Sequence, residues 1–345
     1  MSIIEHSRRA IKGLLFGDTL LPQEFTVGLV EPQAEIAVWL HGMGMPLDVT
    51  QRHSTACSDP FTICVAFDEG RRPDSKDLRH LSLRFCERDG QKRVLGEIGL
   101  RRTATITVPG LDLLLFGARF SSNYCLPRTR LCAHYLFHAY SQRRTVNTSG
   151  MTMSFLDRRA AMVTFIRPHP VGLVSLVGES GGNIFPMNIM GELGNGRFAF
   201  GLKESRRAAH LVESAGRIAL SSVPISQAPL AYQLAVNHFK ESIVWDELPI
   251  ATKMSAAFQI PVPVFAQRVR EMKIERVHRI GSHTFFVAQI ISNERFTNEA
   301  ELCVIHGFYQ VWRLRERSAE LEASLREDSL NKGLRPSKKS TQCTV

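Results

Sequence analysis

Several motifs that would identify a cofactor class are missing from this sequence. It has no Cys-x-x-Cys pair, and its seven cysteines are an odd number. Neither a zinc ribbon nor a closed disulfide framework is therefore indicated. The chain also lacks a Gly-x-Gly-x-x-Gly pattern and a P-loop. A Rossmann-type nicotinamide site is therefore not supported.

Long apolar runs are lacking as well. No stretch approaches the roughly 20 uninterrupted apolar residues of a transmembrane helix, so we expect no membrane span. Residues 1–17 contain only a short apolar patch and no small-residue cleavage site, so we expect no signal peptide. Reduced thiols fit the cytoplasm. Four cysteines lie inside apolar runs and are predicted to be core residues: Cys57, Cys64, Cys132 and Cys303.

Positive charge, by contrast, is abundant. The 345 residues include 43 Lys and Arg against 33 Asp and Glu, which gives a formal net charge of +10. Such a balance suits anionic partners, phosphates or nucleic acid, but it describes the field of the whole molecule and not a site. No single strand interleaves aromatic and basic residues as base-stacking surfaces do, so nucleic acid is the least favoured partner.

Short apolar runs between Gly, Pro and Asn make up most of the chain, and this pattern predicts a mainly β barrel or sandwich. The run Leu131–Phe137 is included among the expected strands. Few helices are expected, at residues 204–215, 227–239 and 315–327.

The chain also resembles itself. EPQAEIAVWLHG from Glu31 matches RPHPVGLVSLVG from Arg167, which defines a first sequence offset. GLDLLLFGARFSSN from Gly110 matches GSHTFFVAQIISNE from Gly281 at a second, larger offset, and LCAHYLFHAY from Leu131 matches LCVIHGFYQV from Leu302 at that same second offset. Two blocks in the same order predict an internal duplication whose second copy carries an insertion of about 35 residues.

One stretch, FGLKESRRAAHLVESAGRIALSSVP from Phe200, brings together three cations and a hydroxyl at the start of a predicted helix. Ser205 can cap that helix, and an anion there would meet backbone N–H groups as well as positive side chains. From this stretch alone, a solvated and merely charged helix start is the alternative. The residues concerned are Lys203, Ser205, Arg206 and Arg207.

From Met162 to Leu314 the chain resembles the flavin reductase-like FMN-binding split barrels, and the flavoredoxin-type members most closely. The segments RPHPVGLVSLVGESGGNIFPMNIMG, RFAFGLKESRRAAHLVESAGRIALSSVP and ELCVIHGFYQV carry the resemblance. It implies a mainly β fold of two tandem split β-barrels, antiparallel and Greek-key, with a few short helices. The expected organisation is a degenerate barrel-like domain (1–145), a linker (146–160), the FMN-binding barrel (161–315) and a helical, then disordered basic tail (316–345).

The resemblance implies a flavin with its phosphate near the helix start and its ring against the loop that follows Asn183. Glycines and amides in that loop would let backbone approach the ring. The matching segment GELGNGRF lacks the Pro-Pro and hydroxyl found in many relatives, so we expect Lys203, Ser205 and the arginines to bind the phosphate instead. The implied cofactor-binding residues are Asn183, Phe185, Met187, Asn188, Lys203, Ser205, Arg206 and Arg207, with an ordinary hairpin connection as the alternative for the loop.

His306 is the one catalytic candidate, since it could orient a nicotinamide or contact the flavin; a packed strand histidine is the alternative. No metal site is predicted, because His134 and His138 have no carboxylate close by in the sequence. The first half is expected to be the built-in partner of the second, forming a pseudo-dimer within the chain, and a further homodimer stays open.

The function implied is that of an FMN-dependent oxidoreductase of the flavin reductase type. FMN, or alternatively FAD, would take hydride from NADH or NADPH and pass electrons to an acceptor, including an electron-acceptor protein as partner. Two alternatives remain: a non-catalytic flavin-binding or electron-carrier protein, and a nucleic-acid-binding β-barrel.

Overall fold

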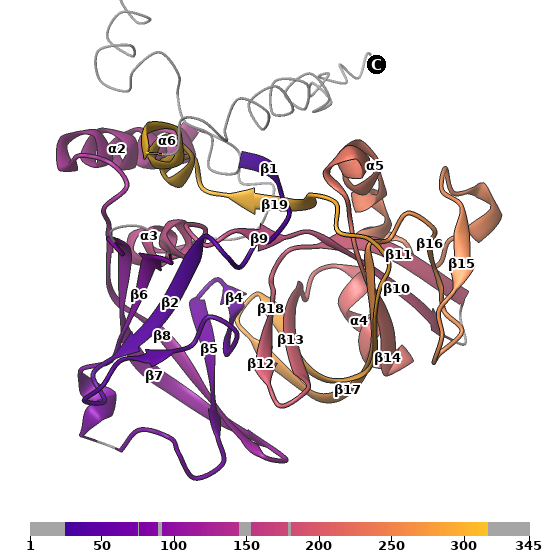
Figure 1. The fold of residues 1–345 in the computed structure, drawn as a ribbon, viewed down its shortest axis with the longest axis horizontal. Helices are drawn as coiled ribbons and strands as arrows, with labels where there is room; N and C mark the ends of the chain where they lie inside the picture. The colour runs from indigo at the N-terminus through magenta and orange to yellow at the C-terminus, as the bar shows by residue number, and fades with distance from the viewer. Residues whose placement is uncertain (1–24, 75, 89–91, 145–152, 179–180, 317–345) are drawn as a thin grey trace, which may run out of the picture.

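Two curled antiparallel sheets of seven strands each form the body of the molecule, which is described here from a computed structural model (Figure 1). The structure describes residues 25–74, 76–88, 92–144, 153–178 and 181–316. The first sheet has the order β3-β2-β6-β7-β8-β5-β4. Its strands are β2 (Ile36–His41), β3 (Leu47–Asp48), β4 (His53–Ser58), β5 (Phe61–Asp68), β6 (Ser82–Glu87), β7 (Val94–Val108) and β8 (Leu111–Asn123).

The second sheet has the order β11-β10-β14-β17-β18-β13-β12. Its strands are β10 (Gly172–Gly178), β11 (Gly181–Met187), β12 (Met190–Gly194), β13 (Arg197–Lys203), β14 (Arg217–Ser222), β17 (Arg268–Ile280) and β18 (His283–Arg295). The prediction of a mainly β fold with two tandem antiparallel barrels is therefore confirmed.

The two sheets correspond strand for strand. Val38 of β2 faces Phe85, and Val174 of β10, its counterpart at the first sequence offset, faces Leu220. The β7–β8 and β17–β18 hairpins turn at Gly110 and Gly281, which the second offset relates and which have φ values of 77° and 53°. At these positions both offsets join residues that have the same place in the two sheets. The match of LCAHYLFHAY with LCVIHGFYQV does not, because Leu131 lies in a helix (Arg128–Arg144) and Leu302 in a strand (Glu301–Ile305).

The halves differ most between β14 and β17. Residues 223–267 form the extra segment, whereas only residues 88–93 separate the equivalent strands β6 and β7 along the chain. The segment contains η2 (Ile225–Gln227), α5 (Ala228–Gln233), η3 (Leu234–Phe239), η4 (Trp245–Glu247), β15 (Thr252–Met254) and β16 (Pro261–Pro263). A second difference lies after β13, where α4 (Arg207–Ala215) takes the place of the single turn η1 (Asp77–Arg79) of the first half.

The remaining elements connect the two halves. Strand β19 (Glu301–Ile305) pairs with β1 (Phe25–Leu29) from the first half and with β9 (His169–Pro170). Helix α3 (Phe155–Thr164), capped by the Ser154 hydroxyl, packs on β8, and α2 (Arg128–Arg144) lies beside α6 (Gly307–Glu316) in Figure 1. His134 of α2 and Phe308 of α6 are in ring contact at 5.1 Å.

Two sequence expectations for these helices need comment. The strand expected at Leu131–Phe137 is wrong, because this segment belongs to α2. The helix expected at 315–327 coincides with α6 only at residues 315 and 316, and its remainder and the basic tail lie outside the described residues. Among the described helices, none is both long enough and apolar enough to cross a membrane.

Close backbone contact joins the two barrels at β4. A Cβ atom on Gly191 of β12 would overlap the His53 carbonyl oxygen, at a separation that side chains essentially never show. Ser282 donates its backbone N–H to the Asp59 carbonyl oxygen at 2.8 Å. Glycine is therefore required at Gly191 for the two sheets to approach this closely.

Candidate functional site

A cleft of about 430 Å³ opens where the two halves meet. Its first wall comes from β4 and β5, with Thr55, Ser58 and Phe61, and its second from α3, with Arg158, Met162 and Phe165. The second barrel supplies residues 186–189, from the end of β11 and the turn to β12, then Lys203 at the end of β13, and Arg206. We call the space lined by these residues the cationic cleft.

The charge of the cationic cleft is of one sign. Lys203, Arg206 and Arg158 line it, and no Asp or Glu is among its described lining residues. Burial lowers the pKa of Lys203, and the neighbouring Arg206 lowers it further. Burial also lowers the pKa of Arg206 and of Arg158. Half-buried cations without a carboxylate among the described lining residues favour an anionic ligand, which would reduce the repulsion between them.

The two arginines at the start of α4, Arg206 and Arg207, point in different directions. Arg206, the N-cap of α4, holds its guanidinium 5.3 Å from the centre of the Phe239 ring. Arg207 instead forms an ion pair with Glu241 at 2.9 Å and does not line the cleft. Ser205 is exposed and gives α4 no side-chain cap. Two of the four residues predicted for the phosphate therefore face the cleft.

The predicted loop residues divide in a similar way. Met187 and Asn188 line the cleft. Asn183 and Phe185 are fully buried on β11 and do not line it. The Asn183 amide donates to the carbonyl oxygens of Asn237 and Lys240 at 3.1 and 3.0 Å, so this side chain fastens the extra segment to the barrel.

Four buried histidines complete the lining: His169, His238, His283 and His306. Burial lowers the pKa of His306 to about 3, with further lowering by His138 and His134. Burial first, then Lys203 and Arg206, lower the pKa of His283 to about 4. At neutral pH these imidazoles are neutral, so they add hydrogen-bonding atoms to the cleft without adding charge.

His306, the catalytic candidate, has a defined tautomer. The backbone N–H of Phe308 donates to its Nδ1 at 3.1 Å, so Nε2 carries the proton. That Nε2 is buried and has no hydrogen-bond partner among the described residues. His238 is the reverse case, since its Nε2 donates to the Pro186 carbonyl oxygen at 2.8 Å and its buried Nδ1 has no partner in the part of the chain that the structure describes. A bound ligand could satisfy both atoms.

Sequence reasoning missed the cleft residues that lie far from the β13–α4 motif. Arg158 falls in the expected linker, His238 belongs to no motif, and His283 lies in the repeat segment GSHTFFVAQIISNE, which carried no prediction of a site. The expectation that the first half helps to enclose the site was the available signal, and Thr55, Ser58 and Phe61 line the cleft from that half.

The matching position of the first half has a different chemistry. Phe67, the counterpart of Lys203 at the first sequence offset, is buried. Asp68 follows it and forms an ion pair with Arg52 at 2.9 Å. An apolar ring and a paired carboxylate therefore replace the free cations at the end of this strand. Among the described residues, no group of three or more metal-ligating side chains occurs in either half.

Comparison with known proteins gives matches to solved structures alone. No protein family model matches the chain. No curated protein matches it either. An FMN-binding protein from Thermus thermophilus is 21% identical over 37% of this chain and 73% of its own, with a TM-score of 0.34.

Two further solved structures resemble the chain. An NADH:FAD oxidoreductase from Streptomyces globisporus is 18% identical over 44% of this chain and 89% of its own, with a TM-score of 0.36. BorF is the flavin reductase component of a bacterial two-component tryptophan halogenase. It is 17% identical over 44% of this chain and 94% of its own, with a TM-score of 0.39. The solved structures that this chain resembles are thus flavin reductase and FMN-binding split-barrel proteins, each matched over less than half of this chain.

Proposed function

We propose that the cationic cleft binds a flavin nucleotide and that the protein is an oxidoreductase of the flavin reductase type. The observation that supports this most strongly is the charge of the cleft: Lys203, Arg206 and Arg158 line it without any Asp or Glu among its described lining residues. A phosphate monoester carries about −1.5 to −2 charges near neutral pH, which would balance such a group.

The residues present fit a flavin. Lys203 and Arg206 would hold the phosphate by charge-assisted hydrogen bonds. Met187 and Phe165 offer apolar and aromatic surface for a planar ring. The volume of about 430 Å³ lies within the range of small-molecule sites. Both FMN and FAD present a phosphate to such a cleft, and FMN is the simpler fit to a single group of cations.

The hydride chemistry would come from the bound flavin, which can accept two electrons and a proton from NADH or NADPH and pass electrons to an acceptor. The chain would contribute position and exclusion of water. His306 would donate its Nε2–H to the ligand, since this atom is buried without a partner among the described residues. Because the pKa of His306 is lowered to about 3, its role is that of a neutral donor and not of a proton source.

The organisation of the chain predicts how many flavins each chain binds. We infer that residues 25–123 are a degenerate copy of the barrel formed by residues 172–295, joined to it through α2 and α3. The matching strand orders and sequence offsets support a duplication. The first copy lacks a lysine at the position of Phe67, so one flavin per chain is expected. The pairing of the copies would replace the partner subunit of a dimer.

Titration with FMN tests the site directly. Replacing Lys203 and Arg206 together with Gln should weaken FMN binding at least about tenfold, because each charge-assisted bond to a phosphate contributes about 1.5–3 kcal/mol. Quenching of flavin fluorescence provides the dissociation constant. Arg207→Gln is the matched control, because this neighbouring cation pairs with Glu241 outside the cleft. Equal affinities of the double variant and the control would contradict the assignment.

Anaerobic mixing of the flavin-loaded protein with NADH or NADPH then separates the two flavin-based functions. Bleaching of the flavin absorbance on catalytic time scales supports the reductase. Tight flavin binding without bleaching by either nicotinamide supports a flavin-binding or electron-carrier protein that uses the same cleft.

A further inference from the structure

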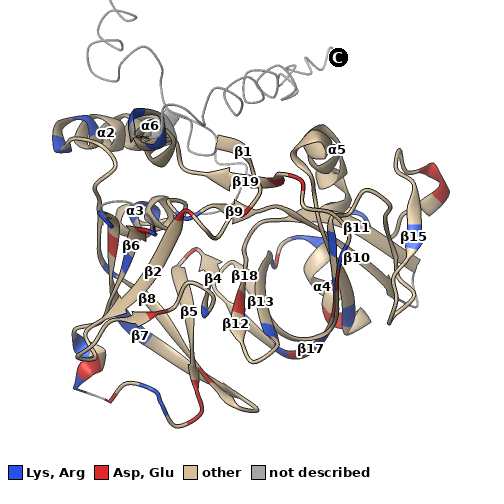
Figure 2. Cartoon of the chain, viewed as in Figure 1, with Lys and Arg blue, Asp and Glu red and all other residues tan. Residues whose placement is uncertain are grey.

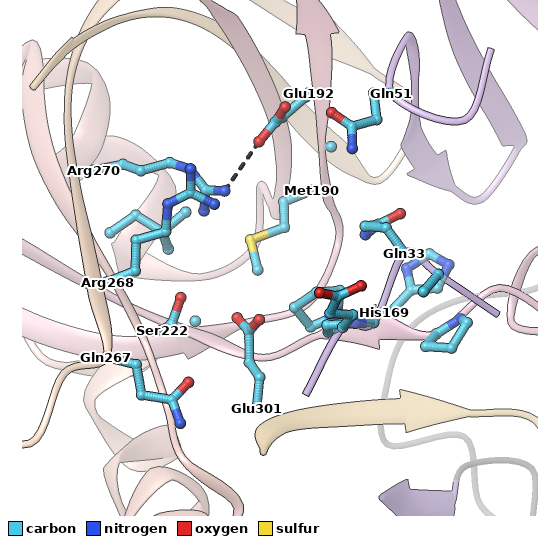
Figure 3. Close-up of a pocket in the computed structure, with 18 of the residues that line it drawn as sticks. Gln33, Gln51, His169, Met190, Glu192, Ser222, Gln267, Arg268, Arg270 and Glu301 are labelled. Carbon is cyan, nitrogen blue, oxygen red and sulfur yellow. Dashed lines mark hydrogen bonds and ion pairs between the residues drawn. The ribbon is translucent and has the colours of Figure 1, made fainter. Parts of the chain in front are cut away.

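A second cavity, of about 440 Å³, lies on the other side of His169 from the cationic cleft. His169 lines both spaces, and its ring stacks on Phe165 at 4.4 Å. This second space, which we call the arginine pocket, lies between the Gln33 loop of the first half and the start of β17 in the second barrel (Figure 3). Among the described lining residues, it shares no cation with the cationic cleft.

Arg167 is the first feature of the arginine pocket that needs an explanation. Its side chain is 6% exposed, yet the described residues give it no ion pair with a carboxylate. Its guanidinium donates to Gln33 Oε1 from Nε at 2.7 Å and also from Nη2, and to His53 Nε2 from Nη1 at 3.4 Å. Glu192 and Asp48 favour its charge electrostatically, but among the described residues only neutral groups hydrogen-bond it. A buried cation held in this way is costly for the fold.

The opposite wall adds three more guanidinium groups. Arg268 of β17 is paired in register with Arg295 of β18, and Arg270 lies two positions along, on the same face as Arg268. Like charges in directly opposed positions destabilise a sheet. Glu192 forms an ion pair with Arg270 at 3.0 Å, and Glu301 interacts electrostatically with all three arginines. The buried Arg270 Nε still has no hydrogen-bond partner among the described residues.

The whole lining has an excess of positive charge: five arginines stand against three glutamates. Figure 3 shows the head groups of Arg268 and Arg270 beside each other, with Glu301 directed into the same space. Ser222 and Gln267 add a hydroxyl and an amide. These groups can exchange hydrogen bonds with hydroxyls of a ligand, while the arginines can take its anionic end.

We propose that the arginine pocket is a second binding site, for a phosphate ester that carries hydroxyl groups, such as a sugar phosphate. The excess of two positive charges matches a phosphate monoester dianion. Arg167, Arg268 and Arg270 bind the phosphate, and the Glu301 side of the pocket accepts hydrogen bonds from the hydroxyls. Because the Gln33 loop belongs to the first half, occupation of this site ties the two halves together. The site is independent of whether the cationic cleft binds a flavin.

Calorimetric titration with ribose 5-phosphate tests the proposal on the full chain. The intact protein is expected to bind it, and to bind ribose without the phosphate at least about tenfold more weakly. Arg268→Gln should lower the affinity for ribose 5-phosphate about tenfold or more, because a charge-assisted contact is lost. Arg276→Gln is the matched control on the same strand, since this exposed arginine lies outside the pocket and its loss changes the net charge equally.

Two further variants distinguish this site from the cationic cleft and from a fold defect. Lys203→Gln should leave ribose 5-phosphate binding unchanged if the ligand occupies the arginine pocket. Arg167→Met should abolish binding in a protein that still unfolds cooperatively, which a melting curve of the unliganded variant checks, because the substitution also leaves Gln33 Oε1 and His53 Nε2 without their donor. Loss of binding in Lys203→Gln, or equal affinities of Arg268→Gln and Arg276→Gln, would overturn the proposal. Inorganic phosphate binding as tightly as ribose 5-phosphate would contradict the part played by the hydroxyl contacts.

Discussion

Lys203 shows how a single residue acquires its role from its surroundings. It ends β13, where burial and Arg206 together lower its pKa. The nearby Arg207 has the same charge but forms an ion pair with Glu241 instead. In the sequence the two cations are equivalent parts of one motif. The direction in which the helix start turns each side chain decides which of them can contact a ligand.

His283 carries a prediction about pH. Its pKa is lowered to about 4, against an ordinary value of 6.5, by burial and then by Lys203 and Arg206. Between these values the unfolded chain binds the proton and the folded chain does not. The free energy of unfolding should therefore fall as the pH drops from about 6.5 toward 4. In His283→Gln the melting temperature should depend less steeply on pH over that window; an unchanged slope would contradict the assigned pKa.

At the scale of elements, the Asn183 amide makes two of the bonds that fasten the extra segment 223–267 to the second barrel, beside those from Asn237 to the Ile184 carbonyl and from His238 to the Pro186 carbonyl. Asn183 is fully buried on β11 and donates to the carbonyl oxygens of Asn237 and Lys240. His238, which lies between them, thereby reaches the cationic cleft. The loop resemblance indicated a ligand contact for Asn183, but its actual partners belong to a distant part of the chain, which no local pattern could reveal.

Replacing Asn183 with Ala should destabilise the protein by about 1–3 kcal/mol, because two buried carbonyl groups lose their donor. Hydrogen exchange should rise in residues 237–240 before it rises in the sheet. Asn298→Ala, at an exposed position, serves as the control. Uniform exchange changes over the whole barrel would show that Asn183 does not hold this segment specifically.

Most elements could be predicted from the sequence because their burial follows local periodicity. The strands of both sheets alternate with Gly and Pro punctuation, and the two sequence offsets identified their correspondence. Leu131–Phe137 failed for a physical reason: its buried residues, Leu131, His134 and Tyr135, recur at a spacing of three and four, as in a helix. The N-cap of α4 is Arg206, one residue after the predicted Ser205. A sequence pattern locates a helix end only to within one or two residues, so it could not distinguish these two positions.

At the scale of the whole molecule, the site depends on the contact between the two barrels. Lysines and arginines are distributed over both halves (Figure 2), so net charge alone would not identify a site. What locates the cationic cleft is the approach of β4 to the second sheet. Gly191 permits that approach, since a Cβ there would overlap the His53 carbonyl oxygen.

Gly191→Ala should therefore separate the halves slightly, lowering both the melting temperature and the affinity for FMN. Gly117→Ala on β8 is the matched control, because the nearest atom to its added Cβ lies at 3.6 Å, an ordinary contact distance. If the two variants have equal stability and equal FMN affinity, the barrel contact is not what forms the cleft.

The number of flavins per chain tests the central claim most directly, namely that the second barrel binds the phosphate while the first only encloses the ligand. The protein would be saturated with FMN and the unbound FMN removed by gel filtration. The flavin concentration, from its absorbance, would then be divided by the protein concentration. The account predicts a ratio near one, and a ratio near zero in the Lys203→Gln, Arg206→Gln double variant. A ratio of two, or a ratio near one that the double variant retains, would contradict it.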